Sequence, residues 1–462
     1  MKLCVALLFL FSATIGAHAA PNIITIVTDD QGRWAMGAYG NEDIHTPAMD
    51  RIAAEGALFT RAFVVSPVCS PARATFLSGR YPTELGITEW ISPEESAAGL
   101  GLDAPTWVEV LQEQGYDTAL FGKWHLGSAP DHHPTKKGYD HFMGFLLGGT
   151  KPVDAVLEVN GVEEKVEGPL PDRLTDAALA WIDTVSKKDA PFHVSLHFRA
   201  PHLPYGPVPK EDTAPYEGKT PRIPSFPGVD KEKVRRSTSA YYASITSVDR
   251  NIARLLDYLD ANDLTKDTIV LFTSDHGYNE GRHSINTKGN GHWIAGGVSG
   301  PKRPNMWDTS IAVPLAIRWP GVVEPGTVHT AMVSNLDIYR TITGMAEIEL
   351  HPQSTAHGAD FSTLLRGEDF PDYRPLFGQY DLHNNGLAYM RMIRTEKYKY
   401  VRHFHANMMD EMYDLENDPD EGNNLYRKLK RQGDPDGLIE DLQKQLLEEM
   451  KRIDDPLLKD AY

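Results

Sequence analysis

One of the two cysteines, Cys69, opens the run Cys69-Ser70-Pro71-Ala72-Arg73. A cysteine can supply the nucleophile for covalent catalysis, which divides one difficult reaction into two easier steps. Residues four apart on a helix lie on the same face, so Arg73 can reach the side chain at position 69. Cys4 lies in an apolar N-terminal segment, and a lone thiol in an exported chain needs an explanation. The alternative to a reactive site is an inert, buried cysteine.

Other groups capable of chemistry follow four apolar segments. The segments and their groups are 22–27 with Asp29 and Asp30, 117–121 with Lys123 and His125, 192–198 with His202, and 268–273 with Asp275 and His276. The composition of these segments predicts four strands. In an open parallel sheet, the ligand site lies beyond the carboxyl ends of the strands. The four clusters therefore predict one shared site, although a single Asp after a strand is often only a helix cap.

The elements around these strands predict an α/β fold with a mainly parallel central sheet. Apolar periodicity predicts helices over 48–63, 106–114 and 240–261. The long segment 279–305 is rich in Gly, Asn and His, and we expect a loop near the site there.

The pattern changes after about Ser362. Residues 388–403 predict a β-hairpin, and residues 437–453 predict a closing amphipathic helix. We therefore predict a catalytic domain at 21–367 and a smaller C-terminal α+β subdomain at 368–462.

Residues 1–20 have the composition of a secretory signal peptide. Lys2 is followed by an apolar run from Leu3 to Ile15, and Ala17-His18-Ala19 has the small residues of a cleavage site. An uncleaved anchor is the less favoured alternative, because a membrane span needs about 20 apolar residues. We predict a secreted or periplasmic protein, with cleavage after about residue 19 or 20 and no membrane attachment afterwards.

The chain is acidic, with a net charge of −18. An acidic protein is a poor candidate for nucleic-acid binding, so we expect no nucleic-acid partner. If the substrate is an anion, a local basic pocket must overcome the repulsion.

The run from Cys69 to Arg80 resembles the signature of the formylglycine-dependent (type I) sulfatases of the alkaline phosphatase superfamily. That signature is a Cys-x-Pro-x-Arg core followed by Thr-Gly-Arg or Ser-Gly-Arg, here Ser78-Gly79-Arg80. The resemblance continues in the expected order through Asp29-Asp30, Gly122 to Gly127, Pro201-His202, Ser274 to Gly277, Val313-Pro314, Trp319 to Gly321 and Tyr413 to Leu415. It implies an alkaline-phosphatase-like α/β sandwich with a central, mainly parallel sheet and a smaller C-terminal α+β domain.

The resemblance implies that Cys69 is oxidised to formylglycine, an aldehyde whose hydrate carries two hydroxyls on one carbon. One hydroxyl attacks sulfur and the alcohol leaves; the other then loses its proton and expels sulfate as the aldehyde re-forms. A plain thiol or serine would stay sulfated. This maturation requires a formylglycine-generating enzyme as a partner, and the sequence does not show whether Cys69 is converted in a given preparation.

The resemblance also implies one Ca²⁺ per chain, held by Asp29, Asp30, Asp275, His276 and the modified Cys69. Three carboxylates favour a hard, oxygen-preferring cation, which would acidify the hydroxyl and bind sulfate oxygens. The family often has Asn where this chain has His276. Imidazole is a softer ligand, which leaves the identity of the metal open.

Three further residues take roles near the nucleophile by the same resemblance. Arg73 orients the nucleophile and the metal carboxylates, Lys123 bridges the nucleophile and the sulfate, and His125 is the base that assists sulfate release. The alternatives to these roles are that Arg73 forms a surface ion pair and that His125 is a hydrogen-bonded imidazole of the core.

Two more basic groups, His202 and Lys302, are expected to hold the sulfate and to protonate or polarise the leaving oxygen. The family has a basic residue a few positions before an aromatic–acidic pair, here Trp307-Asp308. Arg303 competes with Lys302 for that role, and the sequence does not choose between them.

We therefore predict hydrolysis of R–O–SO₃⁻ to an alcohol and sulfate, on a sulfated small molecule or oligosaccharide. A sulfated carbohydrate is expected from the resemblance alone, and an N-sulfated sugar or an aryl sulfate stays open. Two other functions stay open as well: a phosphonate or phosphate-ester hydrolase of the same superfamily, and a non-catalytic binder of sulfated glycans.

Overall fold

The structure is a computed structural model that describes residues 20–293, 303–350, 354–370, 374–384, 386–405 and 408–460. The predicted signal peptide, apart from its last residue, and Lys302 lie outside the described residues. Within the described part, no helix is long and apolar enough to cross a membrane.

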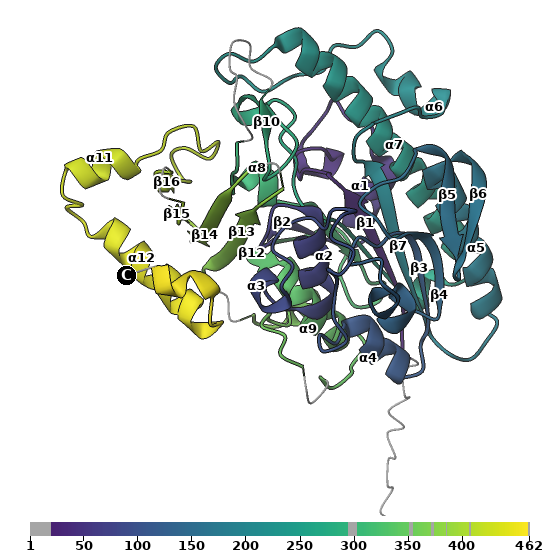
Figure 1. The fold of residues 1–462 in the computed structure, drawn as a ribbon. Helices are drawn as coiled ribbons and strands as arrows, with labels where there is room; N and C mark the ends of the chain where they lie inside the picture. The colour runs from purple at the N-terminus through teal and green to yellow at the C-terminus, as the bar shows by residue number, and fades with distance from the viewer. Residues whose placement is uncertain are drawn as a thin grey trace, which may run out of the picture.

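A large sheet lies at the centre of the molecule (Figure 1). Its described strands are, in order across the sheet, β12 (Thr327–Ser334), β2 (Ala57–Phe63), β11 (Leu315–Arg318), β8 (Thr268–Ser274), β1 (Asn22–Asp29), β7 (Phe192–Pro201), β3 (Asp117–Lys123), β4 (His141–Phe145), β5 (Val153–Val159) and β6 (Val162–Pro169). The strands β8, β1, β7, β3 and β4 pair in parallel, whereas β11, β5 and β6 pair with their neighbours in antiparallel fashion. The mainly parallel α/β sheet predicted from the sequence is confirmed.

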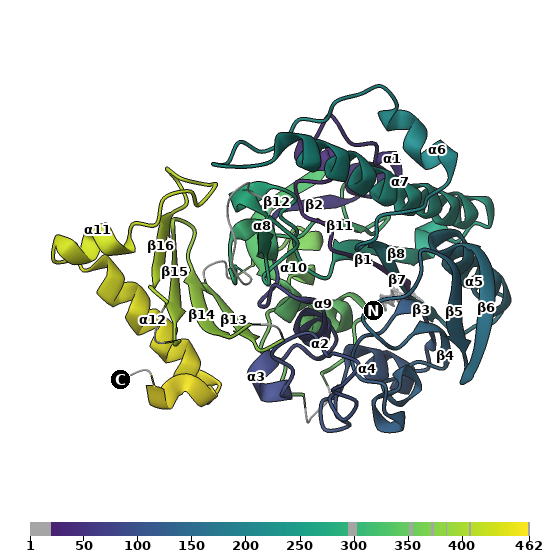
Figure 2. The same cartoon turned by 45° about the horizontal axis from the view of Figure 1, so that its top comes forward.

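Helices cover both faces of this sheet (Figures 1 and 2). On β1, Ile24 and Ile26 face one hydrophobic cluster, and Ile23 and Val27 face the other. The first cluster includes α1 (Pro47–Ala54), α5 (Leu170–Val185) and α7 (Lys231–Ala261); the second includes α2 (Cys69–Ser78), α4 (Trp107–Glu113) and α9 (Ile338–Met345). Because both faces are covered, the central strands are apolar throughout rather than alternating.

The predicted helix over 48–63 is wrong in its second half. The helix α1 ends at Ala54, and the remaining residues form β2, which pairs with β11 and β12. Gly56 lies at the break, where an added Cβ would come within 2.1 Å of the Ile317 carbonyl oxygen. Close approach of two strands therefore decides the conformation here.

The helix α7 begins earlier than predicted, at Lys231. The Asp230 side chain accepts a hydrogen bond from the backbone N–H of Lys233 (3.0 Å), which caps the first turn. The shorter helices are α3 (Pro82–Leu85), α6 (Lys210–Thr213), α8 (Asp308–Ile311) and α10 (Ser362–Leu365), and β9 (Ile285–Asn286) pairs with β10 (His292–Trp293).

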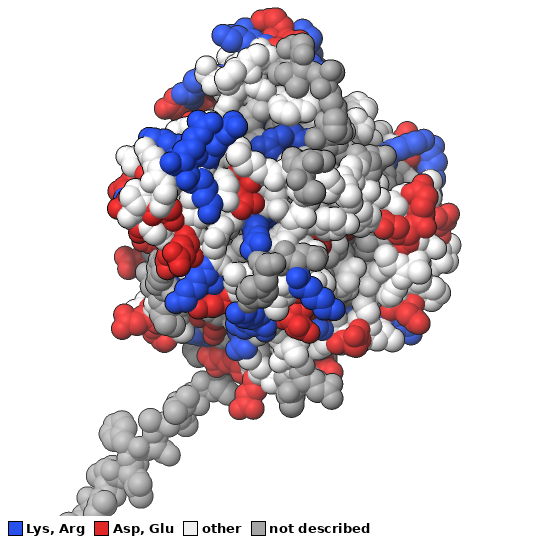
Figure 3. All heavy atoms as spheres, turned by 60° about the vertical axis from the view of Figure 1, so that its left-hand side comes forward, with Lys and Arg blue, Asp and Glu red and all other residues white. Residues whose placement is uncertain are grey.

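A separate antiparallel sheet follows toward the C-terminus (Figure 1). It contains β13 (Leu376–Leu382), β14 (Ala388–Arg394), β15 (Tyr398–His403) and β16 (Glu411–Asp414), with α11 (Tyr426–Arg431) and α12 (Leu438–Arg452) beside it. The predicted hairpin, closing helix and small α+β part are confirmed, whereas the boundary after residue 367 stays a prediction. Lys and Arg are interspersed with Asp and Glu on the described surface that Figure 3 shows.

Candidate active site

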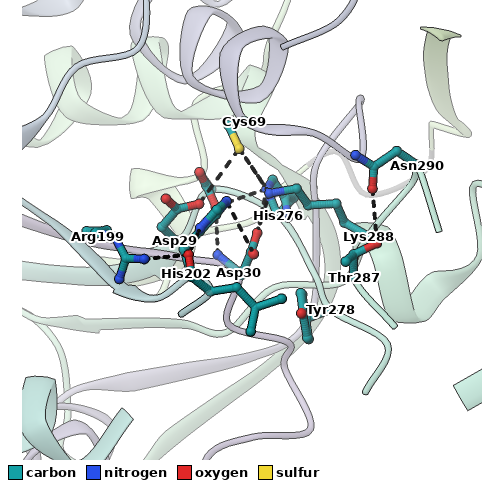
Figure 4. Close-up of polar contacts among 12 residues, drawn as sticks. Asp29, Asp30, Cys69, Arg199, His202, His276, Tyr278, Thr287, Lys288 and Asn290 are labelled. Atoms are coloured by element: carbon teal, nitrogen blue, oxygen red, sulfur yellow. Dashed lines mark hydrogen bonds and ion pairs between the residues drawn. The ribbon is translucent and has the colours of Figure 1, made fainter. Parts of the chain in front are cut away.

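Groups from the ends of β1, β7 and β8 meet at one place (Figure 4), and Lys123 from β3 joins them through its contact with Asp29. Asp29 ends β1, Lys123 ends β3, and Asp275 and His276 directly follow β8. The strands that carry them are neighbours in the sheet and parallel, so their carboxyl ends lie at the same edge. The shared site is confirmed as an arrangement of side chains.

Cys69 enters this site from the first residue of α2. Its side chain is buried, and Sγ lies 3.7 Å from Asp29 Oδ1 and 3.5 Å from His276 Nε2. Arg73 lies one turn further along the helix, where Nε donates to Asp275 Oδ2 at 3.0 Å and Nη1 donates to the Lys123 carbonyl at 3.2 Å. The predicted placement of Arg73 beside Cys69 and the carboxylates therefore agrees with the structure.

Four of the predicted metal ligands form a compact donor set. The ligand atoms of Asp29, Cys69, Asp275 and His276 all lie within 4.8 Å of one another, and Asp29 and Asp30 form a second such group with His202. His276 Nδ1 lies 2.9 Å from the Gly277 carbonyl. Because a carbonyl can only accept a hydrogen bond, Nδ1 carries a proton, and Nε2 is the atom that can ligate a metal. Carboxylate oxygens with one oriented imidazole fit a divalent cation.

Each of the three carboxylates Asp29, Asp30 and Asp275 also contacts a lysine or an arginine. Lys123 Nζ lies 2.6 Å from Asp29 Oδ2, and Lys288 Nζ lies 2.6 Å from Asp30 Oδ1, in addition to the Arg73–Asp275 pair. Lys288 Nζ also lies 3.1 Å from Cys69 Sγ. Positive charge therefore surrounds the side chain at position 69, as binding of a tetrahedral anion requires.

A family model described as Sulfatase matches residues 21–348, which is more than half of the chain. The chain belongs to the sulfatase family. A second model, the C-terminal part of N-sulphoglucosamine sulphohydrolase, matches residues 301–452. The chain is therefore a sulfuric ester hydrolase, and its two sheets correspond to the alkaline-phosphatase-like fold expected from the sequence.

Curated relatives cover most of this sulfatase. It is 29% identical over 429 residues to the ulvan-active sulfatase of Formosa agariphila. The aligned region covers 88% of this chain and 77% of that protein. It is 27% identical to the N-acetylglucosamine-6-O-sulfatase of Bacteroides thetaiotaomicron (92% and 86% covered) and 29% identical to human steryl-sulfatase (78% and 72% covered).

A solved structure described as a complex with its substrate D-glucosamine-2-N,6-O-disulfate is also similar. That chain is 25% identical to this sulfatase, with a TM-score of 0.78 and coverage of 92% of this chain and 98% of that one.

Burial and charge act in opposite directions on the acids of the site. Burial opposes ionisation of Asp29, but Lys123, His202 and Lys288 outweigh it and hold the pKa of this carboxyl well below its usual value. Burial also raises the pKa of the Cys69 thiol, and again Lys123 and Lys288 outweigh it and hold that pKa well below the ordinary range. Both side chains are therefore anionic near neutral pH.

The paired groups Asp275 and His276 shift in the other direction. Burial raises the pKa of Asp275, and the Asp275 carboxylate, working against burial, raises the pKa of His276. The imidazole thus carries a second proton, on Nε2, in the metal-free cluster. Binding of a divalent cation through Nε2 must release that proton, which makes metal affinity depend on pH.

Two other histidines of the site are oriented by backbone carbonyls. His125 Nε2 lies 3.0 Å from the Ile91 carbonyl, so Nε2 carries the proton and Nδ1 is the basic atom. Burial and the Lys123 ammonium lower the pKa of His125, which keeps it neutral. His202 donates from Nδ1 to the Leu203 carbonyl at 2.8 Å, and its Nε2 lies 3.9 Å from Asp30 Oδ2.

Asp30 and His125 both adopt left-handed backbone conformations, with φ of 73° and 59°. L-residues adopt this region at a cost, and such residues are frequent at functional sites.

The structure adds Lys288 and Arg199, which the sequence analysis does not single out. Lys288 lies in the long segment 279–305, and its position there is the only sequence signal for it. Of the two residues expected for a similar role, Lys302 lies outside the described residues, and Arg303 forms an ion pair with Glu411 at 3.2 Å.

Arg199 lies near the end of β7 and is 3% exposed. Its Nη1 donates to the Pro204 carbonyl at 3.1 Å, and its Nη2 donates to the Leu203 carbonyl, the same oxygen that accepts from His202. Figure 4 shows Arg199 and His202 side by side at this carbonyl. The guanidinium therefore fixes the segment that orients His202.

Proposed function

We propose that this sulfatase removes sulfate from sulfated carbohydrates through formylglycine made from Cys69, with one bound Ca²⁺. The observation that carries the proposal is the position of Cys69 Sγ, 3.5 Å from His276, 3.7 Å from Asp29 and 3.1 Å from Lys288. A nucleophile at position 69 is thus in reach of both the metal-ligand cluster and an ammonium group.

Calcium held by Asp29, Asp30, Asp275, His276 and the modified residue 69 would acidify the attacking hydroxyl and bind sulfate oxygens. Lys123 and Lys288 flank the same position from two sides. Their ammonium groups stabilise the negative charge that develops on the sulfate oxygens and on the nucleophile.

In the first step a hydroxyl of residue 69 gives its proton to the Asp29 carboxylate, which lies 3.7 Å from position 69. The hydroxyl oxygen then forms a bond to sulfur, and the bond from sulfur to the alcohol oxygen breaks. The departing alkoxide takes a proton from His202 Nε2, the ring atom that faces the cluster, or from Lys288. In the second step the neutral His125 removes the proton of the remaining hydroxyl through Nδ1. The carbon–oxygen bond to sulfate then breaks and the aldehyde re-forms.

The carbohydrate substrate class is supported by the names of similar proteins, which act on ulvan, on N-acetylglucosamine-6-sulfate and on a disulfated glucosamine. Human steryl-sulfatase, at a similar identity, represents the competing class of apolar sulfate esters. We propose export by the signal peptide at 1–20, which N-terminal sequencing of secreted protein tests directly.

The test uses protein co-produced with a formylglycine-generating enzyme, with conversion of CH₂SH to CHO at residue 69 checked by mass spectrometry. Sulfate release is measured on galactose, N-acetylglucosamine and glucosamine sulfates, on 4-nitrocatechol sulfate and on a steroid sulfate. We expect the highest kcat/KM on one of the sugar sulfates. Faster turnover of matched phosphate or phosphonate esters, or binding without turnover by converted protein, would contradict the proposal.

A further inference from the structure

Asn290 lies two residues after Lys288, at the same side of the site (Figure 4). Its side chain is 8% exposed, and its Oδ1 accepts a hydrogen bond from the Thr287 hydroxyl at 3.0 Å. Among the described residues nothing accepts a hydrogen bond from its Nδ2. Figure 4 shows this nitrogen turned toward the centre of the site and the oxygen turned toward Thr287. The amide is therefore held in one orientation, and its accessible donor has no acceptor among the described residues.

The loop that carries Asn290 is held by other contacts. The Thr287 carbonyl accepts from Asn279 N at 2.8 Å and from Asn279 Nδ2 at 2.9 Å. Gly289 N donates to the Pro67 carbonyl at 3.1 Å, two residues before Cys69, and Asn305 Nδ2 donates to the Lys288 carbonyl at 3.1 Å. The Asn290 amide is thus not needed to hold the loop, and its orientation needs another explanation.

A donor that faces a site and has no acceptor in the protein is satisfied by water or by a ligand. The Lys288 ammonium lies between Asp30 and Cys69, where the sulfate must bind, whereas Asn290 lies beside its stem, further from the nucleophile (Figure 4). An oxygen that Asn290 can reach therefore belongs to the leaving group.

Arg303 links the loop of Asn290 to a cavity beside the C-terminal sheet. Arg303 N donates to the carbonyl of Gly291, the residue after Asn290, at 3.0 Å. Arg303 also borders a cavity of about 380 Å³ whose lining includes Leu382, Leu387, Met408, Met409 and Glu411. Asn290 is not among the residues that line this cavity, which adjoins its loop through Arg303.

We propose that Asn290 donates from Nδ2 to an oxygen of the sugar, on the leaving group rather than the sulfate, and so determines specificity for sulfated carbohydrates. This inference rests on the proposed function. Thr287 acts through Asn290 as a positioning residue, because its hydroxyl fixes the amide oxygen. An aryl sulfate shares the sulfate with the sugar substrate but offers no hydroxyl at this position.

The experiment compares kcat/KM for the best monosaccharide sulfate with kcat/KM for 4-nitrocatechol sulfate in matured wild type, Asn290→Ala and Thr287→Val. We expect Asn290→Ala to lower the ratio of sugar to aryl activity roughly tenfold, as loss of one oriented hydrogen bond predicts, and Thr287→Val to lower it less. The exposed Asn423→Ala is the matched control and leaves the ratio unchanged. Wild-type turnover of the aryl sulfate tests the proposed function separately.

If the Asn290→Ala variant loses turnover, its affinity for the sugar sulfate can still be measured. In the Cys69→Ala background, calorimetric titration with the same sugar sulfate is expected to show roughly tenfold weaker binding when Asn290→Ala is added. An unchanged ratio with unchanged affinity would overturn the assignment of Asn290. Equal losses on the sugar and aryl substrates would place its donor on the sulfate and would also overturn the proposal.

Discussion

The active site and the C-terminal sheet each bury an arginine between carboxylates, but they use its donors differently. Arg391 on β14 donates from Nε to Asp455 (2.6 Å), from Nη1 to Asp381 (2.6 Å) and from Nη2 to Asp455 (3.1 Å). Arg73 uses Nε and Nη1, while its buried Nη2 has no partner among the described residues.

A similar contrast holds for the surrounding charges. In the C-terminal part, Lys399 lies 2.6 Å from Asp308 and 2.6 Å from Glu421, so one ammonium joins two carboxylates. At the active site, the carboxylates instead share their neighbourhood with a nucleophile and an imidazole within metal-ligand distance. The Lys399 cluster pairs its charges without a ligand and joins β15 to α8, whereas the active-site cluster is arranged for groups that bind to it.

The largest effect is expected from Cys69→Ala. It removes the proposed nucleophile while only a small side chain is lost, so turnover should fall by a factor of roughly 10⁴ or more and the fold should stay intact. The measurements are kcat/KM on the best sulfate ester and the thermal unfolding midpoint. Ser78→Ala, at the other end of α2, is the control. Retained activity in Cys69→Ala would refute the assigned nucleophile.

Removal of the metal should have the next largest effect. Because three carboxylates and His276 are the proposed ligands, treatment with a chelator should lower activity roughly a hundredfold or more, and added Ca²⁺ should restore it. Asp275→Asn should cause a comparable loss that Ca²⁺ restores only in part. Asp308→Asn, in the C-terminal cluster, is the matched control for loss of a buried carboxylate. Indifference to the chelator would contradict the ligand assignment.

The Arg391 cluster, by contrast, should affect stability rather than activity. Asp455→Asn removes one partner of the fully buried Arg391 and is expected to lower the free energy of unfolding by about 3 kcal/mol, because a buried charge loses its compensation. Denaturant unfolding measures the change, and kcat/KM at low temperature should stay close to that of the wild type. A loss of activity without loss of stability would mean that the two clusters do not differ as the hydrogen bonds indicate.

A smaller effect is expected from Arg199, which acts on catalysis only through the Leu203 carbonyl and His202. Arg199→Met should lower kcat/KM for sugar sulfates roughly tenfold, because a poor leaving group depends on a correctly placed acid. Aryl sulfates, whose alcohols leave more readily, should lose less. The half-buried Arg254→Met serves as a control, and equal losses on both substrate classes would argue against a role in orienting His202.

The sequence predicts the convergence at the site well and predicts one local structure wrongly. Asp29, Lys123 and Asp275 follow apolar strands directly, so their meeting depends only on the strands being parallel neighbours. Residues 57–63 continue the apolar pattern of the preceding helix, and only pairing with β11 and β12 makes them a strand. Periodicity within one segment does not contain that information.

Lys288 was missed for a related reason. It lies in a loop without periodicity, and it reaches Asp30 because Gly289 bonds to Pro67 and Asn305 bonds to the Lys288 carbonyl. These contacts join residues far apart in the chain. Spacing from Trp307-Asp308 favoured Lys302 or Arg303 instead, although Arg303 pairs with Glu411.

The smallest effect is expected at His193, a buried imidazole without an oppositely charged partner among the described residues. His193 on β7 donates from Nδ1 to the Ile23 carbonyl (3.0 Å) and lies 2.9 Å from the Ser195 hydroxyl, and burial lowers its pKa to about 3. The folded protein thus disfavours the protonated form, so its stability is full above the unfolded-state pKa near 6.5 and falls as the pH drops below it. The slope is at most about 1.4 kcal/mol per pH unit. Urea unfolding at pH 7 and pH 5 should show a smaller pH dependence for His193→Gln than for wild type, even if the variant is less stable at both. An equal pH dependence in the two proteins would mean that His193 does not stay neutral in the fold, and that acid sensitivity arises instead at the paired clusters.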